Sequence, residues 1–164
     1  MEILFENRYV RDKAFAKEFY RYYYFEKSSL ITFYGVILLA SILLAVFEKI
    51  YLWFVLVFVP VLFLFQFYRY FHQINIMLQQ DKELAGGEVT VHMIATEDFI
   101  QNTASSGEIK RIHYDAIQYV KQTKNLILLR SKAESVFIFL KNSFEKGTED
   151  EFVAFLKRKG VKEK

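Results

Sequence analysis

The sequence contains no cysteine and a single proline, Pro60. Without cysteine the chain forms no disulfide, uses no thiolate nucleophile and binds no metal through cysteine. Its histidines, His72, His92 and His113, lie far apart, and none has a second ligand at the i+4 spacing of a helical metal site. Phosphate-binding glycine loops and Gly-x-Ser-x-Gly motifs are missing as well. We therefore expect no enzymatic activity, no cofactor and no metal.

A large excess of charge of one sign is also lacking. The formal net charge is +3, and charged residues make up 25% of the chain. Domains that bind nucleic acids usually carry a concentrated basic patch or stripe. We expect no nucleic-acid partner.

Apolar residues are abundant instead, at 53% of the chain. Residues 28–47 and 50–68 carry no charge, and only Glu48-Lys49 separates the two runs. About 20 apolar residues are enough for a helix to cross a bilayer. Because two residues cannot return a chain across a bilayer, the runs must form an antiparallel pair. The sequence thus predicts a two-helix transmembrane hairpin over residues 28–68.

Basic residues gather beside the ends of this hairpin rather than at its tip. The tip has Lys49 alone, whereas the flanks carry Arg8, Arg11, Lys13, Lys17, Arg21, Lys27 and Arg69. Basic residues near membrane spans favour the cytoplasmic side. This predicts a multi-pass protein of the cell membrane with both termini in the cytoplasm.

Aromatic residues form two clusters next to the predicted spans. The first is Phe19, Tyr20, Arg21, Tyr22, Tyr23, Tyr24 and Phe25, and the second is Phe67, Tyr68, Arg69, Tyr70 and Phe71. A soluble core and a stacking platform for nucleic acid are the alternatives. However, the first cluster points in every direction around a helix, and its segment mixes basic and acidic residues. We interpret both clusters as anchors at a membrane interface.

Small residues and the proline lie within the predicted spans. Ser41 and Ala45 are four residues apart, with Gly35 nearby, and this spacing lets helices approach closely. Pro60 removes one backbone donor in the second span, so we expect a bend there. These four residues are candidates for helix packing.

The rest of the chain predicts a connecting helix and a small sheet domain. Helical spacing continues over residues 69–84 and ends at Gly86-Gly87. Within the domain at residues 85–164, six strands are expected at 88–95, 97–103, 108–114, 117–123, 126–131 and 136–141. Thr148 and Glu151 form a capping box before a helix with an apolar face at Phe152, Phe155 and Leu156. At the other end of the chain, residues 1–27 are expected to form a cytosolic or interfacial helix.

Several features together resemble the YcxB-like family of small bacterial membrane proteins. They are the aromatic N-terminal segment, the close-set apolar runs, Tyr114-Asp115-Ala116-Ile117, Lys141 with Phe144, and the helix "EDEFVAFLKRKG". The resemblance implies a bacterial cell membrane protein whose cytosolic domain has a pleckstrin-homology-like sheet and helix.

The sequence as a whole predicts an α+β membrane protein. Its parts are an N-terminal helix, a transmembrane hairpin and a cytosolic antiparallel sheet, pleckstrin-homology-like, with a C-terminal helix. We expect a non-enzymatic, membrane-anchored protein-interaction or regulatory module. The alternative is an immunity protein that protects the producing bacterium against a secreted, membrane-acting toxin. The expected partners are the lipid bilayer and a protein, and homo-oligomers are left open.

Overall fold

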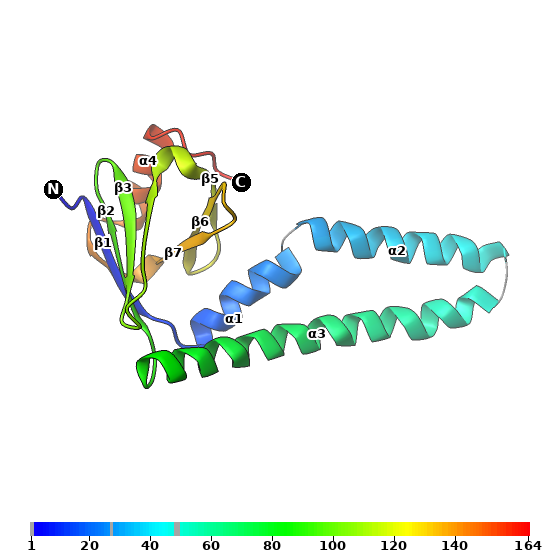
Figure 1. Cartoon of the computed structure of the whole chain (residues 1–164). Helices are drawn as coiled ribbons and strands as arrows, with labels where there is room; N and C mark the ends of the chain where they lie inside the picture. Colours follow the sequence, from blue (N-terminus) through cyan, green and yellow to red (C-terminus); the bar gives the residue numbers. More distant parts are fainter. Residues whose placement is uncertain (1, 27, 48–49) are drawn as a thin grey trace. The chain divides into compact units, whose positions relative to one another are not determined.

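The computed structural model describes the backbone of residues 2–26, 28–47 and 50–164. Side chains are described for these residues except 26, 28–31, 45–47 and 50–55. The chain divides into two units: the sheet unit, residues 1–15 and 79–164, and the helical unit, residues 16–78. The fold is α+β with antiparallel sheets (Figure 1).

The sheet unit has two antiparallel sheets and a helix. Five strands occur in the order β4-β3-β2-β1-β8 and three in the order β5-β6-β7. Their bounds are β1 Phe5–Val10, β2 Thr90–Ala95, β3 Phe99–Ala104, β4 Ile109–His113, β5 Ile117–Gln122, β6 Leu126–Ser131, β7 Val136–Leu140 and β8 Phe144–Lys146. Short 3-10 turns, η2 (Tyr114–Ala116) and η3 (Lys141–Ser143), precede β5 and β8. The six strands expected from the sequence are present as β2 to β7.

Helix α4 (Glu149–Arg158) closes the core of the sheet unit. The Phe152 side chain is fully buried, and its ring centroid lies 4.3 Å from that of Phe139 on β7 and 5.2 Å from that of Phe5 on β1. The predicted capping box is confirmed, because Thr148 accepts a hydrogen bond from the Glu151 amide and Glu151 accepts one from the Thr148 amide. The helix therefore starts where the sequence indicates, and it joins strands of both sheets.

Strand β1 corrects the expected N-terminal helix. Residues 5–10 are paired with β2 on one side and β8 on the other. The buried Asn7 side chain donates to the Leu140 carbonyl at 2.8 Å and accepts from the Leu140 amide at 3.1 Å. Tyr9 donates its hydroxyl to the Ile138 carbonyl. The segment extends because a β-sheet supplies partners for its backbone, and its inward side chains satisfy polar groups along β7.

The helical unit contains most of α1 (Lys13–Arg21), then the π-helical turn η1 (Tyr22–Glu26), α2 (Ser28–Phe47) and most of α3 (Ile50–Ala85). Helix α3 continues through Pro60 and through the predicted connecting segment as one helix. Gly86, with φ of +71°, follows its last residue. A left-handed glycine at this position is the usual way for a helix to stop.

The predicted transmembrane hairpin is corrected. In the part of the chain that the structure describes, no helix has both the length and the apolar character needed to cross a membrane. Described side chains cover residues 32–44 of α2, and in α3 they begin at Leu56 and soon include Gln66, Arg69 and His72. The other positions of the two predicted spans lie outside the residues whose side chains are described.

Two further expectations are corrected by the same finding. From the sequence we expected an α+β membrane protein that crosses the bacterial cell membrane more than once. Both expectations required spanning helices, which the described residues do not provide. The pleckstrin-homology-like assignment stays a prediction.

Candidate functional site

The helical unit brings the two aromatic clusters of the sequence into contact. The Phe25 ring, from η1, lies with its centroid 5.3 Å from that of Phe67 and 5.6 Å from that of Tyr70, both on α3. The Arg69 guanidinium lies 5.5 Å from the centre of the Tyr24 ring, within cation–π range. Residues more than forty positions apart in the sequence therefore form one aromatic contact region.

Other members of the clusters occupy different environments. Tyr24 is buried, Phe19, Tyr20, Tyr22 and Phe25 are half-buried, and Arg21, Tyr23, Phe67, Tyr68, Arg69 and Phe71 are exposed. The Tyr68 ring stacks on His72, and the Tyr70 hydroxyl donates to the Lys17 carbonyl at 3.2 Å. Burial raises the pKa of Tyr70, and the nearby Arg21 opposes that shift. The assignment of these residues as membrane-interface anchors is a prediction that the contacts do not test.

Gln66 is a functional candidate that sequence reasoning missed. It is buried on α3, donates to the Tyr24 carbonyl at 3.1 Å and accepts from the Tyr34 hydroxyl at 3.2 Å. The carbonyl belongs to η1, where the wider π-helical turn changes the regular backbone pairing. The amide thus joins α2, α3 and the aromatic turn. The signal was a single amide within the apolar run "LFLFQFY".

A cavity of about 370 Å³ lies beside this hydrogen-bonded group. Its walls come from η1, α2 and α3, and they include Tyr24, Tyr34, Gly35, Phe63 and Gln66. A Cβ atom added to Gly35 would have no neighbour within 4 Å, so the glycine leaves open space in this wall. The cavity can hold an apolar group, and the amide of Gln66 and the hydroxyl of Tyr34 beside it are hydrogen-bonded to each other.

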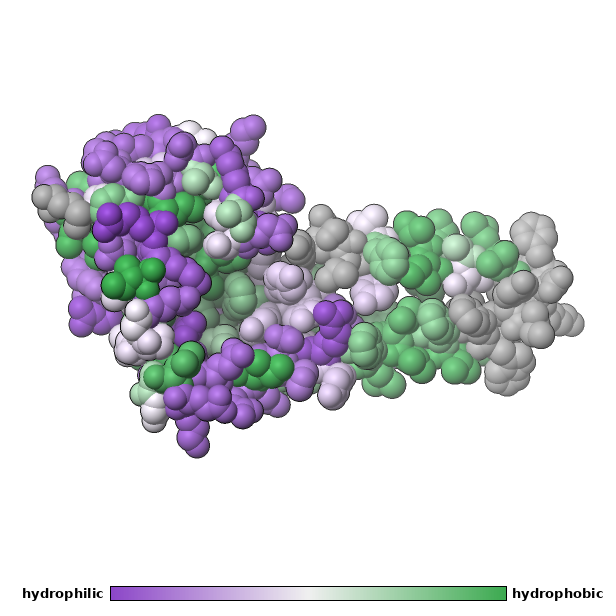
Figure 2. Space-filling view, viewed as in Figure 1, coloured by the Kyte–Doolittle hydropathy of each residue, from purple (hydrophilic) through white to green (hydrophobic). Residues whose placement is uncertain are grey.

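The outer surfaces of α2 and of residues 56–68 of α3 are mainly apolar where they are described. On α2, Phe33, Val36, Leu39 and Leu43 are exposed, with Leu39 at 61%. On α3, the exposed large side chains include Leu56, Val57, Val61, Leu64, Phe65 and Phe71, with Leu64 at 68%. Figure 2 shows hydrophobic colouring over the described parts of α2 and of the N-terminal half of α3, and mostly hydrophilic colouring over the sheet unit. We call these exposed apolar residues of α2 and α3 the apolar helical surface.

The predicted helix-packing residues lie in different surroundings. Gly35 lines the cavity, Ser41 is buried at 8% exposure, and Pro60 is exposed on α3. Ala45 lies outside the residues whose side chains are described. The structure therefore does not assemble the four into one described packing seam.

The described side chains place the histidines on different neighbours. His72 stacks on Tyr68, and His113 packs against the Phe99 ring with its Nδ1 atom 3.2 Å from the Asp98 carbonyl. His92 Nε2 lies 2.6 Å from Glu6 Oε1. Sequence reasoning did not foresee the last contact, because Glu6 belongs to the unexpected strand β1.

Comparison with known proteins gives one family. The model of the YcxB-like protein family matches residues 95–156, which run from the end of β2 into α4. Neither the curated proteins nor the solved structures contain a match to the chain. The similarity thus covers much of the sheet unit and supports the resemblance seen in the sequence.

Proposed function

We propose that this chain is a non-enzymatic protein-interaction module whose apolar helical surface binds a partner protein. The carrying observation is the exposure of large apolar side chains along both α2 and α3. Exposed apolar patches of this kind mark surfaces that another apolar surface covers. Burying them releases about 25 cal/mol for each Å² removed from water.

The cavity supports a protein as that partner. Protein interfaces concentrate their binding energy in a few anchor side chains that enter well-packed pockets. A cavity of about 370 Å³ with mostly apolar walls suits one large apolar side chain.

The similarity to the YcxB-like family concerns the sheet unit and not the helices that are proposed to bind the partner. The matched residues, 95–156, contain none of the apolar helical surface. In this proposal the partner binds the helices and not the sheet unit, so the exposed residues that match the family stay accessible to solvent. An immunity role stays a prediction from the resemblance, because no contact among the described residues favours a toxin over another protein.

Site-specific photo-crosslinking in living cells tests the proposal. A photoreactive residue is placed at Leu39 on α2 or Leu64 on α3 of the full chain, with Lys110 on β4 as the matched exposed control. We expect the same protein adduct from both helix positions, none from the control, and loss of the adduct when Phe33→Asp is added. An adduct between two copies of the chain would identify the partner as the chain itself.

Two outcomes would contradict the proposal. One is crosslinking of the helix positions to lipid alone. The other is a protein adduct that forms equally well from Lys110, because a specific surface on α2 and α3 cannot produce it.

A further inference from the structure

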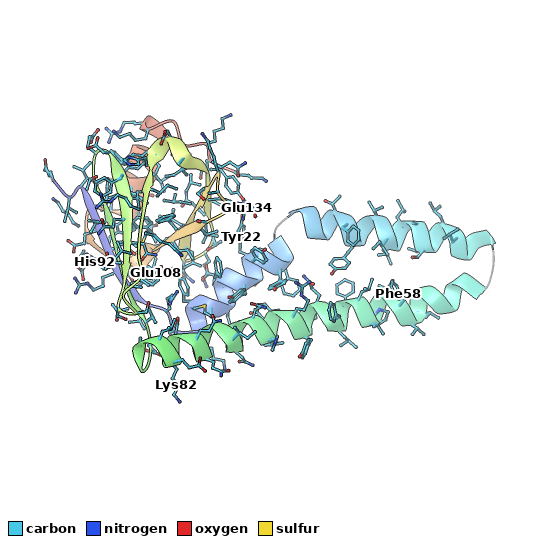
Figure 3. The ribbon with its side chains drawn as sticks, in the orientation of Figure 1. Tyr22, Phe58, Lys82, His92, Glu108 and Glu134 are labelled. Carbon is cyan, nitrogen blue, oxygen red and sulfur yellow. The ribbon has the colours of Figure 1, made fainter. Side chains whose placement is uncertain are left out.

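Three potential metal ligands meet on the outer face of the five-stranded sheet. They are Glu6 on β1, His92 on β2 and Glu145 on β8, and one ligand atom from each lies within 4.8 Å of the other two. Figure 3 labels His92 on the sheet unit. The Glu6 and His92 side chains are partly shielded, at 25% and 34% exposure. These residues belong to no part of the apolar helical surface.

The strand register explains why the three residues meet. Phe5, Asn7 and Tyr9 are buried, so alternation turns Glu6 and Arg8 to the outer face. His92 pairs directly with Arg8 and therefore shares that face.

Glu145 reaches the same place through an irregularity in β8. Asn7 pairs with Phe144 but Glu6 pairs with Lys146, so Glu145 is an extra residue beside Glu6. A bulge of this kind sets two residues opposite one and redirects a side chain. The second carboxylate is thus positioned by backbone geometry as well as by its own rotamer.

The donor set has the composition of a transition-metal site. One imidazole nitrogen and two carboxylate oxygens are ligands that Zn²⁺ accepts, and three protein ligands leave a fourth position for water. An imidazole disfavours Ca²⁺ and Mg²⁺, which prefer oxygen ligands. Ligand atoms around a zinc ion are about 3.3–3.5 Å apart, given Zn–N and Zn–O bonds of about 2.0–2.2 Å. Glu6 and His92, now 2.6 Å apart, need to separate by only about 1 Å.

We propose that Glu6, His92 and Glu145 form a Zn²⁺-binding site that joins β1 to β2 and β8. The ion replaces two weaker contacts, the Glu6–His92 hydrogen bond and the ion pair between Arg8 Nε and Glu145 Oε1 at 3.5 Å. Residues 16–78 separate β1 from the rest of the sheet unit in the sequence. A bound ion therefore fastens the N-terminal strand to the strands that follow the helical unit.

Substitution of Arg8 and substitution of a ligand should change the affinity for Zn²⁺ in opposite directions. The Arg8 guanidinium occupies Glu145 and places a positive charge beside the site, so Arg8→Gln is expected to bind Zn²⁺ at least threefold more tightly. His92→Asn and Glu145→Gln each remove a ligand and are expected to bind at least tenfold more weakly. His113→Asn on the same sheet face and Glu134→Gln in the β6–β7 turn are the matched controls and should bind as the unchanged chain does.

The measurement is calorimetric titration of ZnCl₂ into the full chain, with Co²⁺ absorption as a second readout. We expect one Zn²⁺ to bind per chain and to raise the midpoint temperature of thermal unfolding. We also expect a Co²⁺ absorption spectrum that His92→Asn abolishes. Circular dichroism without metal verifies that each variant is folded. Unchanged affinity in folded His92→Asn would overturn the site, and so would a failure of Arg8→Gln to bind more tightly, because Glu145 would then not hold the ion.

Discussion

The sheet unit and the helical unit use apolar residues in different ways. In the sheet unit, alternate strand residues turn inward, and Phe139, Leu129 and Phe152 have no exposed surface. In the helical unit, the described apolar residues of α2 and α3 lie on several sides of each helix, and most are exposed. The first unit contains the groups that cover its own core. The second leaves large apolar side chains of α2 and α3 exposed.

The two units treat buried side-chain amides in the same way, because each unit has one whose polar atoms are hydrogen-bonded. Asn7 in the sheet unit pairs with both backbone groups of Leu140, and Gln66 in the helical unit pairs with the Tyr24 carbonyl and the Tyr34 hydroxyl. Each amide satisfies a backbone group where regular pairing is incomplete. The two units therefore differ in how far their apolar side chains are buried, and substitutions can test this difference.

Removing a core ring should have the largest effect. Phe152→Ala leaves a cavity among Phe5, Phe139 and Phe144 and should lower the stability of the sheet unit by about 3–5 kcal/mol. Leu39→Ala, on the exposed surface of α2, is the matched control and should change that stability by less than about 0.5 kcal/mol. Hydrogen exchange of the β6 amides in urea measures both. Equal effects would remove the distinction between the two units.

Breaking the Asn7 pairing should have the next largest effect. Asn7→Ala leaves the partly buried amide and carbonyl of Leu140 without their Asn7 partner, at about 1–3 kcal/mol for each group. Faster hydrogen exchange at Leu140 is the expected result, whereas the exposed Asn142→Ala should leave it unchanged. If Asn7→Ala left the Leu140 amide protected, β1 would not be the element that completes the edge of β7.

Local patterns predicted most of the sheet unit but not its N-terminal strand. Period-two alternation located β2 to β7, and the capping box located α4. In "FENRYV", however, the central inward position is Asn7, so the apolar alternation is broken, and the pairing strand β2 begins at Thr90. Strand β8 has three residues, which is too short for a periodic signal.

The candidate sites were less accessible to sequence reasoning because they depend on tertiary pairing. The aromatic clusters could be placed near each other because a hairpin brings the ends of the apolar runs together. The Gln66 contacts require the π-helical turn, and the meeting of Glu6, His92 and Glu145 requires a register shift that no local pattern encodes. The apolar runs also led to predicted membrane spans that the described helices do not support.

A pair of glycine substitutions should have an intermediate effect. Gly147 and Gly160 have φ values of +76° and +82°, so alanine is strained at both, by about 1–2 kcal/mol. A Cβ atom at Gly147 would also collide with the Phe5 ring, whereas one at Gly160 meets open space. Gly147→Ala should therefore cost about 1–3 kcal/mol more than Gly160→Ala, measured by urea unfolding. Equal costs would indicate that β1 moves freely at Phe5.

The smallest expected effect is a pH dependence of the C-terminal tail on β5. Hydrogen bonds from Lys157 and Gln122, together with the charge of Lys157, lower the pKa of Glu163 below its ordinary value of 4.5. A carboxyl whose pKa is lower in the folded state stabilises that state above its unfolded pKa and loses this effect as pH falls through the folded pKa. The Val120 amide, which donates to the Lys162 carbonyl at 2.8 Å, reports on tail docking.

Protection of Val120 from hydrogen exchange, corrected for the intrinsic rate, should therefore be constant well above pH 4.5 and decrease as the pH falls below that value. Glu163→Gln should remove this decrease while leaving the two tail hydrogen bonds of Val120 able to form. Because the Glu163 side chain is exposed, added salt should weaken the pH effect in the unchanged chain. An identical pH dependence in Glu163→Gln would show that another carboxylate of the sheet unit causes it and that Glu163 does not hold the tail.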